Sequence, residues 1–417
     1  MRLEQALRSG RHLSTADPTE AELLIVNTCG FIDASKDESI SVIRDLDSSR
    51  RKGQQLYVVG CLTEIAEAEV RATIPNVDAT FGAEQWDAVA ASVGPASANF
   101  DIPQPEFTNI KQPSAYLKIS DGCDRPCTFC IIPTIKGAMH SDTVSRLIAE
   151  AKAHARDGTR ELVLVAQDST AYGEDQGDRE GLATLLEQLS EAVPDLPWIR
   201  LMYAYPGRVT RLLAETMARL PNVVPYLDMP LQHASPSVLR RMKRPTVNKS
   251  RESINHIRKA IPDVVLRSTF IVGFPGETDS EFEELLTFIE EQRFDHIGAF
   301  TYSAQKGTPA ATLLEQVPEA VKIERYGRLM ELAQSISHDQ NREMIGQEMK
   351  VLVESAEPTT SADGSPVVIG RTYRDAPEVD GLAFVKGEFK PGSMVDVRVE
   401  GALPYDLLCS PLDFHKP

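Results

Sequence analysis

The chain has 417 residues, of which 42% are hydrophobic and 25% charged, a balance that is ordinary for a globular protein of two to four domains. It contains no run of 18 apolar residues and no apolar signal core near its N-terminus, so we expect neither a membrane span nor secretion. Six cysteines are too few for a disulfide scaffold, and we expect the reducing cytoplasm. The net charge of −17 disfavours a broad nucleic-acid-binding face and suits a basic partner, although acidity can also serve solubility alone.

Residues 1–92 alternate strand and helix patterns and are expected to form an N-terminal α/β domain. The apolar runs 21–31 and 55–62 are typical of buried parallel strands, and they contain Cys29 and Cys61 at or near their ends. Because ligands bind at the carboxyl ends of parallel strands, these two cysteines indicate a shared ligand. The alternative is a pair of buried core thiols.

Residues 93–113 are rich in Pro, Ala and Ser without a period, which indicates a linker. A second αβ alternation follows over 114–340, with a clear helical pattern at 142–158. Six strands are predicted, at 115–120, 161–166, 198–203, 224–229, 265–274 and 296–302. Six strands with crossover helices predict a partial parallel (βα)6 barrel, with its site at the carboxyl ends of the strands.

Three cysteines follow the first of these strands within eight residues, at Cys123, Cys127 and Cys130, with the spacing C-x3-C-x2-C. A structural zinc site and an ordinary four-iron cluster each need four protein ligands, and no fourth cysteine lies nearby. Three thiolates on one loop would leave one iron of a [4Fe-4S] cluster open, which suits binding of S-adenosylmethionine. The alternatives are a zinc loop completed by His140 and three unrelated buried thiols.

Polar and glycine-rich phrases follow three of the other strands. Gln167 and Asp168 could bind an amino group or a ribose, although Asp168 could equally cap the next helix. His233 lies at the same predicted rim, where a lone histidine is often structural. The last phrase holds Gly273, Gly276 and Glu277, which could let backbone approach a ligand and offer an acceptor, as many βα turns do. All six are candidate cofactor-binding residues, and no acid–base residue is assigned a catalytic role.

The pattern changes over 341–411 to short strands separated by Gly and Pro turns, which predicts a small all-β barrel. Such barrels often bind nucleic acid. Residues 342–417, however, carry eight Lys and Arg against thirteen Asp and Glu, which disfavours a phosphate backbone as ligand.

Together these phrases resemble the radical S-adenosylmethionine methylthiotransferases over nearly the whole chain. Within this family the chain is most similar to the branch that modifies small-subunit ribosomal protein S-twelve, and its C-terminal barrel resembles a TRAM domain. The phrases that carry the resemblance are NTCGFID (27–33), GCL (60–62), KISDGCDRPCTFCIIP (118–133), LVAQDSTAYG (164–173), PYLDMPLQHAS (225–235), RSTFIVGFPGET (267–278) and DAPEVDG (375–381). The transfer-RNA branch differs at several of these places.

The resemblance implies a reaction. A radical formed from S-adenosylmethionine takes hydrogen from the β-carbon of an aspartate of that ribosomal protein, and a methylthio group is added there. The electron donor would be a flavodoxin or a ferredoxin. The alternatives are a methylthiotransferase acting on an adenosine of transfer RNA and a non-catalytic zinc-binding scaffold.

The resemblance also implies two [4Fe-4S] clusters. Cys123, Cys127 and Cys130 match the ligands of the cluster that binds S-adenosylmethionine, and Cys29 and Cys61 match two of three ligands of an auxiliary cluster. The third auxiliary ligand ends the first strand of a flavodoxin-like domain in the family, and neither that strand nor that cysteine is found here. We expect a start codon placed too late, and full activity is in doubt if the ligand is truly missing.

Overall fold

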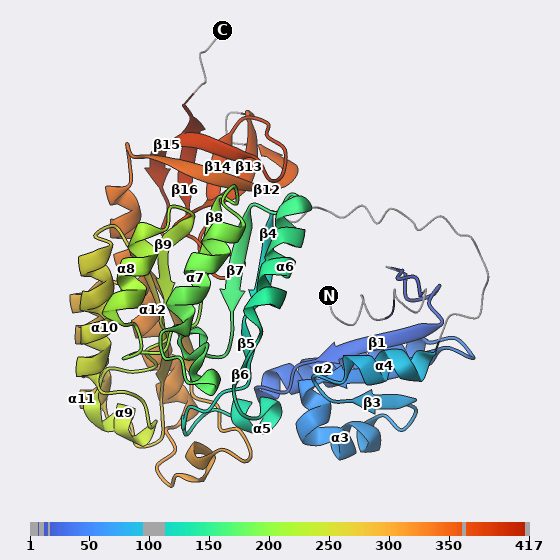
Figure 1. Cartoon of the computed structure of the whole chain (residues 1–417). Helices are drawn as coiled ribbons and strands as arrows, with labels where there is room; N and C mark the ends of the chain where they lie inside the picture. Colours follow the sequence, from blue (N-terminus) through green and yellow to red (C-terminus); the bar gives the residue numbers. More distant parts are fainter. Residues whose placement is uncertain (1–6, 8–11, 16, 95–112, 361–363, 413–417) are drawn as a thin grey trace. The chain divides into compact units, whose positions relative to one another are not determined.

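The computed structural model describes residues 7, 12–15, 17–94, 113–360 and 364–412 (Figure 1). Most of the predicted linker 93–113 lies outside these residues. The chain divides into two compact units. The first comprises Met1–Phe107, Phe129–Gly137 and Ser303–Ala311, and the second comprises Thr108–Thr128, Ala138–Tyr302 and Thr312–Pro417.

The first unit is built on a parallel sheet with the strand order β1-β2-β3, coloured blue in Figure 1. Its core is formed by alternate apolar side chains of β1 and β2 together with Ile43 and Val70 from two helices. Its elements are β1 (Leu23–Thr28), α2 (Asp33–Ser49), β2 (Gln55–Gly60), α3 (Cys61–Thr73), β3 (Ala79–Phe81), α4 (Trp86–Val93) and the short α5 (Ile132–Lys136). The two strands predicted here are confirmed, and β3 was not predicted.

The second unit contains a six-stranded parallel sheet with the order β11-β10-β9-β8-β7-β4, which confirms the predicted sheet. Its strands are β4 (Ser114–Lys118), β7 (Glu161–Val165), β8 (Trp198–Leu201), β9 (Val223–Asp228), β10 (Val265–Val272) and β11 (His296–Thr301). A small antiparallel ladder, β5 (Ser120–Asp121) with β6 (His140–Ser141), follows β4.

Helices cover one face of this sheet (Figure 1). In α7 the leucines 182, 185, 186 and 189 recur at helical spacing, are buried, and join Leu162 and Leu164 of β7 in one apolar cluster. The helices of this unit are α6 (Val144–Arg156), α7 (Gly181–Ala192), α8 (Arg211–Arg219), α9 (Pro236–Arg241), α10 (Val247–Ala260), α11 (Asp279–Gln292) and α12 (Glu319–Glu343), with 3-10 turns η1 (Ser169–Ala171) and η2 (Glu174–Gln176). The 3-10 turn η3 (Pro309–Thr312) belongs mostly to the first unit. No helix of the described residues is long and apolar enough to cross a membrane.

The C-terminal strands form a closed barrel in the order β12-β13-β14-β16-β15, as predicted. In β15 the valines 395, 397 and 399 are buried and alternate with exposed charged residues, which is the two-residue period of a half-buried strand. The strands are β12 (Glu348–Thr360), β13 (Pro366–Thr372), β14 (Ala383–Lys386), β15 (Met394–Ala402) and β16 (Leu407–Pro411).

A segment of this barrel, residues 371–381, lies against the face of the six-stranded sheet that the helices leave uncovered. Val163, which alternates with the helix-facing Leu162 and Leu164, packs in an apolar cluster with Leu352 and Ala376 of the barrel. Several polar contacts join the same faces, among them hydrogen bonds from Arg200 Nη1 to the Tyr373 carbonyl and from Arg267 Nε to Asp380. The barrel therefore contributes directly to the inner side of the sheet.

Candidate functional site at the carboxyl edge of the sheet

The carboxyl ends of the six parallel strands meet at one edge, as they must in a parallel sheet. Close after these ends stand, in chain order, Ser120, Gln167, Tyr203, His233, Gly273 and Tyr302. Two non-glycine residues near this edge, Tyr203 (φ 61°) and Gln232 (φ 74°), adopt the left-handed backbone region. Such conformations cost about 1–3 kcal/mol each and concentrate at functional sites.

Four of these edge residues carry a buried polar atom that has no hydrogen-bond partner within the described part of the chain. The atoms are Ser120 Oγ, Gln167 Oε1, His233 Nε2 and Tyr302 Oη. Burial raises the pKa of Tyr302 to about 12, so its hydroxyl keeps its proton and can donate. Buried polar groups are rarely left unpaired, so four at one edge fit a polar ligand. The sequence pointed to Gln167 and His233, whereas a serine and a tyrosine after a strand carry no such signal.

The tautomer of a neutral His233 ring follows from one of its contacts. The backbone amide of Ser235 donates to Nδ1 at 3.0 Å, so in the neutral ring the proton resides on Nε2. That Nε2 lies 3.6 Å from Glu277 Oε2. Both oxygens of Glu277 already accept hydrogen bonds, from Arg325 Nη1 at 2.9 Å and from the Phe274 amide at 3.0 Å. Glu277 therefore fixes the turn after β10, and its predicted role as a ligand acceptor stays a prediction.

Gly273 and Gly276 occupy the positive-φ backbone that the turn needs, at 72° and 75°. A Cβ at Gly273 would lie 2.3 Å from a side-chain carbon of Lys322, and one at Gly276 would lie 2.9 Å from Glu315 Oε2. The space that the two glycines leave open is thus filled by the side chains of Lys322 and Glu315.

Asp168 caps the next helical turn, which is one of the two roles that the sequence left open, and its role in binding a ligand stays a prediction. Its Oδ1 accepts from the amide of Thr170, 3.0 Å away, which caps the 3-10 turn η1. Its Oδ2 accepts from Arg125 Nε at 2.7 Å, and Arg125 lies between the first two cysteines of the C-x3-C-x2-C motif. The carboxylate therefore braces the cysteine loop against the end of β7.

The cysteine loop is polar and partly accessible. Cys123 and Cys127 belong to the second unit and Cys130 to the first, and all three are half-buried thiols that form no disulfide. Burial, above all other causes, raises the pKa of the Cys123 thiol. Among the described residues, no three His, Cys, Asp or Glu side chains are arranged to hold a metal ion, so the assignment of these thiols to a cluster stays a prediction.

Cys29 and Cys61 come together in the first unit. Each follows directly on one member of the register pair Thr28–Gly60 of the neighbouring strands β1 and β2. A Cβ built on Gly30 would lie 2.9 Å from the Cys61 carbonyl oxygen, so the two chain segments touch here. Cys29 is exposed and Cys61 is half-buried, which argues against the alternative of two buried core thiols.

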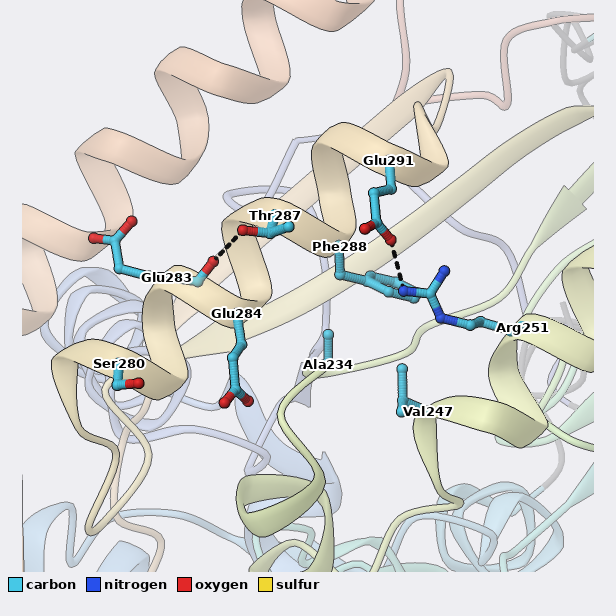
Figure 2. A pocket seen from close by; sticks show the side chains of 9 residues that line it. All are labelled: Ala234, Val247, Arg251, Ser280, Glu283, Glu284, Thr287, Phe288 and Glu291. Atoms are coloured by element: carbon cyan, nitrogen blue, oxygen red, sulfur yellow. Dashed lines mark hydrogen bonds and ion pairs between the residues drawn. The ribbon is translucent and has the colours of Figure 1, made fainter.

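A separate pocket opens on the helical side of the second unit, between α10 and α11 (Figure 2). Arg251 and Glu291 form an ion pair beside Phe288 at one end of it, and Glu284 lies towards the other end. None of the site residues predicted from the sequence lines this pocket.

Three families match consecutive parts of the chain: the uncharacterized protein family UPF0004 over residues 1–82, the Radical SAM superfamily over 117–289 and the TRAM domain over 345–411. The protein is thus a radical SAM enzyme with an N-terminal UPF0004 domain and a C-terminal TRAM barrel, and the superfamily implies a [4Fe-4S] cluster and S-adenosylmethionine as cofactors.

The chain belongs to the RimO family of methylthiotransferases. It is 44% identical to "Ribosomal protein uS12 methylthiotransferase RimO" of Chloroflexus aurantiacus, over 97% of this chain and 94% of that protein. The relative with the same name from Roseiflexus castenholzii is 43% identical over 95% and 89% of the two chains. Membership in this family favours iron–sulfur chemistry over the zinc-scaffold alternative, and it favours the uS12 branch over the transfer-RNA branch.

Among solved structures, the radical S-adenosylmethionine methyltransferase TsrM from Kitasatospora setae, with cobalamin and a [4Fe-4S] cluster bound, superposes with a TM-score of 0.54. The match covers 74% of this chain and 68% of that one at 12% identity, which supports the fold.

Proposed function

We propose that this protein transfers a methylthio group to the β-carbon of an aspartate in ribosomal protein uS12, the S-twelve protein of the small subunit. The observation that carries the proposal is the match to the RimO relative of Chloroflexus aurantiacus over 97% of this chain and 94% of that protein, through all three domains. The acidic C-terminal barrel supports a basic protein as substrate and disfavours nucleic acid.

Cys123, Cys127 and Cys130 would hold the [4Fe-4S] cluster that binds S-adenosylmethionine. When bound, this pair of cofactors supplies a 5′-deoxyadenosyl radical by one-electron cleavage of the sulfonium. The chain orients the cofactor and keeps water out. Four buried polar atoms without a hydrogen-bond partner among the described residues, in Ser120, Gln167, His233 and Tyr302, support a polar ligand at the strand ends. Hydrogen abstraction by a radical needs no general base.

The proposal is tested by mass spectrometry of uS12 incubated with the reconstituted protein, S-adenosylmethionine, a sulfide source and a low-potential reductant. The expected product carries one methylthio group on one aspartate. Replacing Cys127 by Ala should abolish both this product and 5′-deoxyadenosine. Modification of transfer RNA with uS12 unchanged would contradict the proposal and support the transfer-RNA alternative.

Cys29 and Cys61 would hold the auxiliary cluster as two of its ligands. Iron analysis of the reconstituted protein tests this, because two four-iron clusters give about eight irons per chain and one gives about four. Replacing both Cys29 and Cys61 by Ala should lower the iron content from about eight to about four per chain. An iron content that this replacement leaves unchanged would contradict the assignment.

A further inference from the structure

Arg244 lies just beyond the short helix α9, where the chain turns back towards the cysteine loop. The amide of Lys243 donates to the carbonyl of Arg240, and the amide of Arg244 donates to the carbonyl of Leu239. This pair of bonds is the Schellman motif, with Lys243 in the left-handed region at φ 51°. The motif fixes the backbone direction of Arg244.

The end of α9 is also tied directly to the residue after Cys127. The amide of Thr128 donates to the Met242 carbonyl at 3.1 Å, and its hydroxyl donates to the Arg241 carbonyl at 2.9 Å. The helix end and the cysteine loop are therefore held together by backbone contacts that do not depend on the Arg244 side chain.

The guanidinium of Arg244 reaches the second cysteine of the motif. Its Nη1 lies 3.6 Å from Cys127 Sγ in hydrogen-bond geometry, and its Nη2 donates to the Pro230 carbonyl. The group stacks 4.3 Å from the ring centre of Tyr205, which keeps its plane in place. Burial raises the pKa of Tyr205 to about 12, so the stacking partner stays neutral.

Arg244 forms no ion pair with a carboxylate among the described residues. Within the described residues no carboxylate lies at ion-pair distance from it, and its Nε is buried without a hydrogen-bond partner. Arg125 and Arg241, by contrast, each pair with a carboxylate. A half-buried cation without a counter-ion is costly, so the position of Arg244 beside the Cys127 sulfur needs a reason.

We propose that Arg244 is a positioning residue that donates a hydrogen bond to the Cys127 thiolate and thereby raises the reduction potential of the cluster held by the cysteine loop. The inference rests on the proposed function, since it takes Cys127 as a cluster ligand. Reduction adds one electron, taken from a low-potential donor, and no bond to Arg244 forms or breaks. Because the reduced state carries one more negative charge, a neighbouring cation and a hydrogen bond to the ligating sulfur favour it.

The test is a potentiometric titration with dithionite, followed by electron paramagnetic resonance, on the full reconstituted chain without S-adenosylmethionine. Cys29 and Cys61 are replaced by Ala in every protein compared, so that only one cluster is observed. Arg244→Gln should lower the ratio of reduced to oxidised cluster about tenfold at a fixed potential, which is a shift of about 59 mV to more negative values for one electron.

Arg240→Gln is the matched control, because Arg240 is exposed, lies four residues earlier and loses the same charge without touching the loop. Arg244→Lys keeps the charge but loses the planar fork, and it should shift the potential in the same direction by less. Equal potentials in Arg244→Gln, Arg244→Lys and Arg240→Gln would overturn the inference. So would a weaker affinity for S-adenosylmethionine with an unchanged potential. A parent protein that binds no iron would instead refute the proposed function.

Discussion

The side chain of Glu281 caps helix α11 and also binds the neighbouring helix α9. Its Oε2 accepts from the Thr278 amide at 2.8 Å while its own amide donates to the Thr278 hydroxyl, which is a capping box at the start of α11. The same carboxylate pairs with Arg241 at the end of α9 and accepts from the hydroxyl of Ser237. Burial alone would raise the pKa of Glu281, but these partners outweigh it and lower the pKa to about 2.

This pKa sets the direction of a pH effect on stability. A carboxylate whose pKa falls from 4.5 to about 2 on folding stabilises the protein above pH 4.5, and the contribution is lost as the pH falls towards 2. Glu281→Gln should therefore cost about 1–2 kcal/mol at pH 7, and the difference from the wild type should shrink between pH 5 and pH 2.

Urea unfolding at pH 7, 5 and 3 measures this difference. Glu283→Gln is the control. Glu283 lies two residues after Glu281 in α11 and forms an exposed ion pair with Arg328 of α12. Its replacement should change stability by less than about 0.5 kcal/mol. If the Glu281→Gln difference is the same at every pH, the ion pair is not its source.

At the scale of elements, sequence patterns located the strands of the six-stranded sheet to within a few residues. Their runs of Val, Ile and Leu are long because both faces are buried. The three-residue β3 and the six-residue α9 were missed, since neither is long enough to show a period. Gln167 and His233 stood out because they follow strong strands. Arg244 did not, because its contact with Cys127 spans 117 residues of sequence.

The residue Lys243, at the end of the short helix α9, allows the energetic cost of its backbone conformation to be tested. A lysine in the left-handed region carries a steric cost of about 1–2 kcal/mol that glycine avoids. Lys243→Gly should therefore raise the free energy of unfolding by about 0.5–1 kcal/mol, whereas Lys152→Gly in the middle of α6 should lower it by about 1 kcal/mol. Thermal unfolding of the two variants measures the sign of each change in the free energy of unfolding. A loss of stability in both variants would mean that the Lys243 side chain makes a stabilising contact that outweighs the backbone strain.

At the scale of the molecule, the six-stranded sheet and the C-terminal barrel share a buried ionic cluster that the sequence did not reveal. Glu161 Oε1 accepts from Arg200 Nε at 2.7 Å, and its Oε2 accepts from Arg371 Nη2 at 2.6 Å. All three side chains are fully buried. Burial opposes ionisation of Glu161, but the two arginines hold its pKa below the usual value. In sequence, Arg371 lies at the end of a predicted barrel strand, and nothing in the pattern indicates that it is buried against another sheet.

Removing Arg371 leaves Glu161 with Arg200 alone of its two arginine partners and takes the donor away from the buried Asp375 carbonyl, at a cost of about 3–5 kcal/mol. Arg371→Met should lower stability by about this amount, and it should separate the unfolding of the barrel from that of the sheet, because Arg371 of the barrel forms a buried ion pair with Glu161 of the sheet. Urea titrations followed by circular dichroism and by tryptophan fluorescence should then give different midpoints. Lys386→Met, which breaks an exposed pair with Glu400 in the same barrel, should leave one midpoint and change stability by less than about 1 kcal/mol. Coincident midpoints in Arg371→Met would show that apolar packing alone couples the two parts.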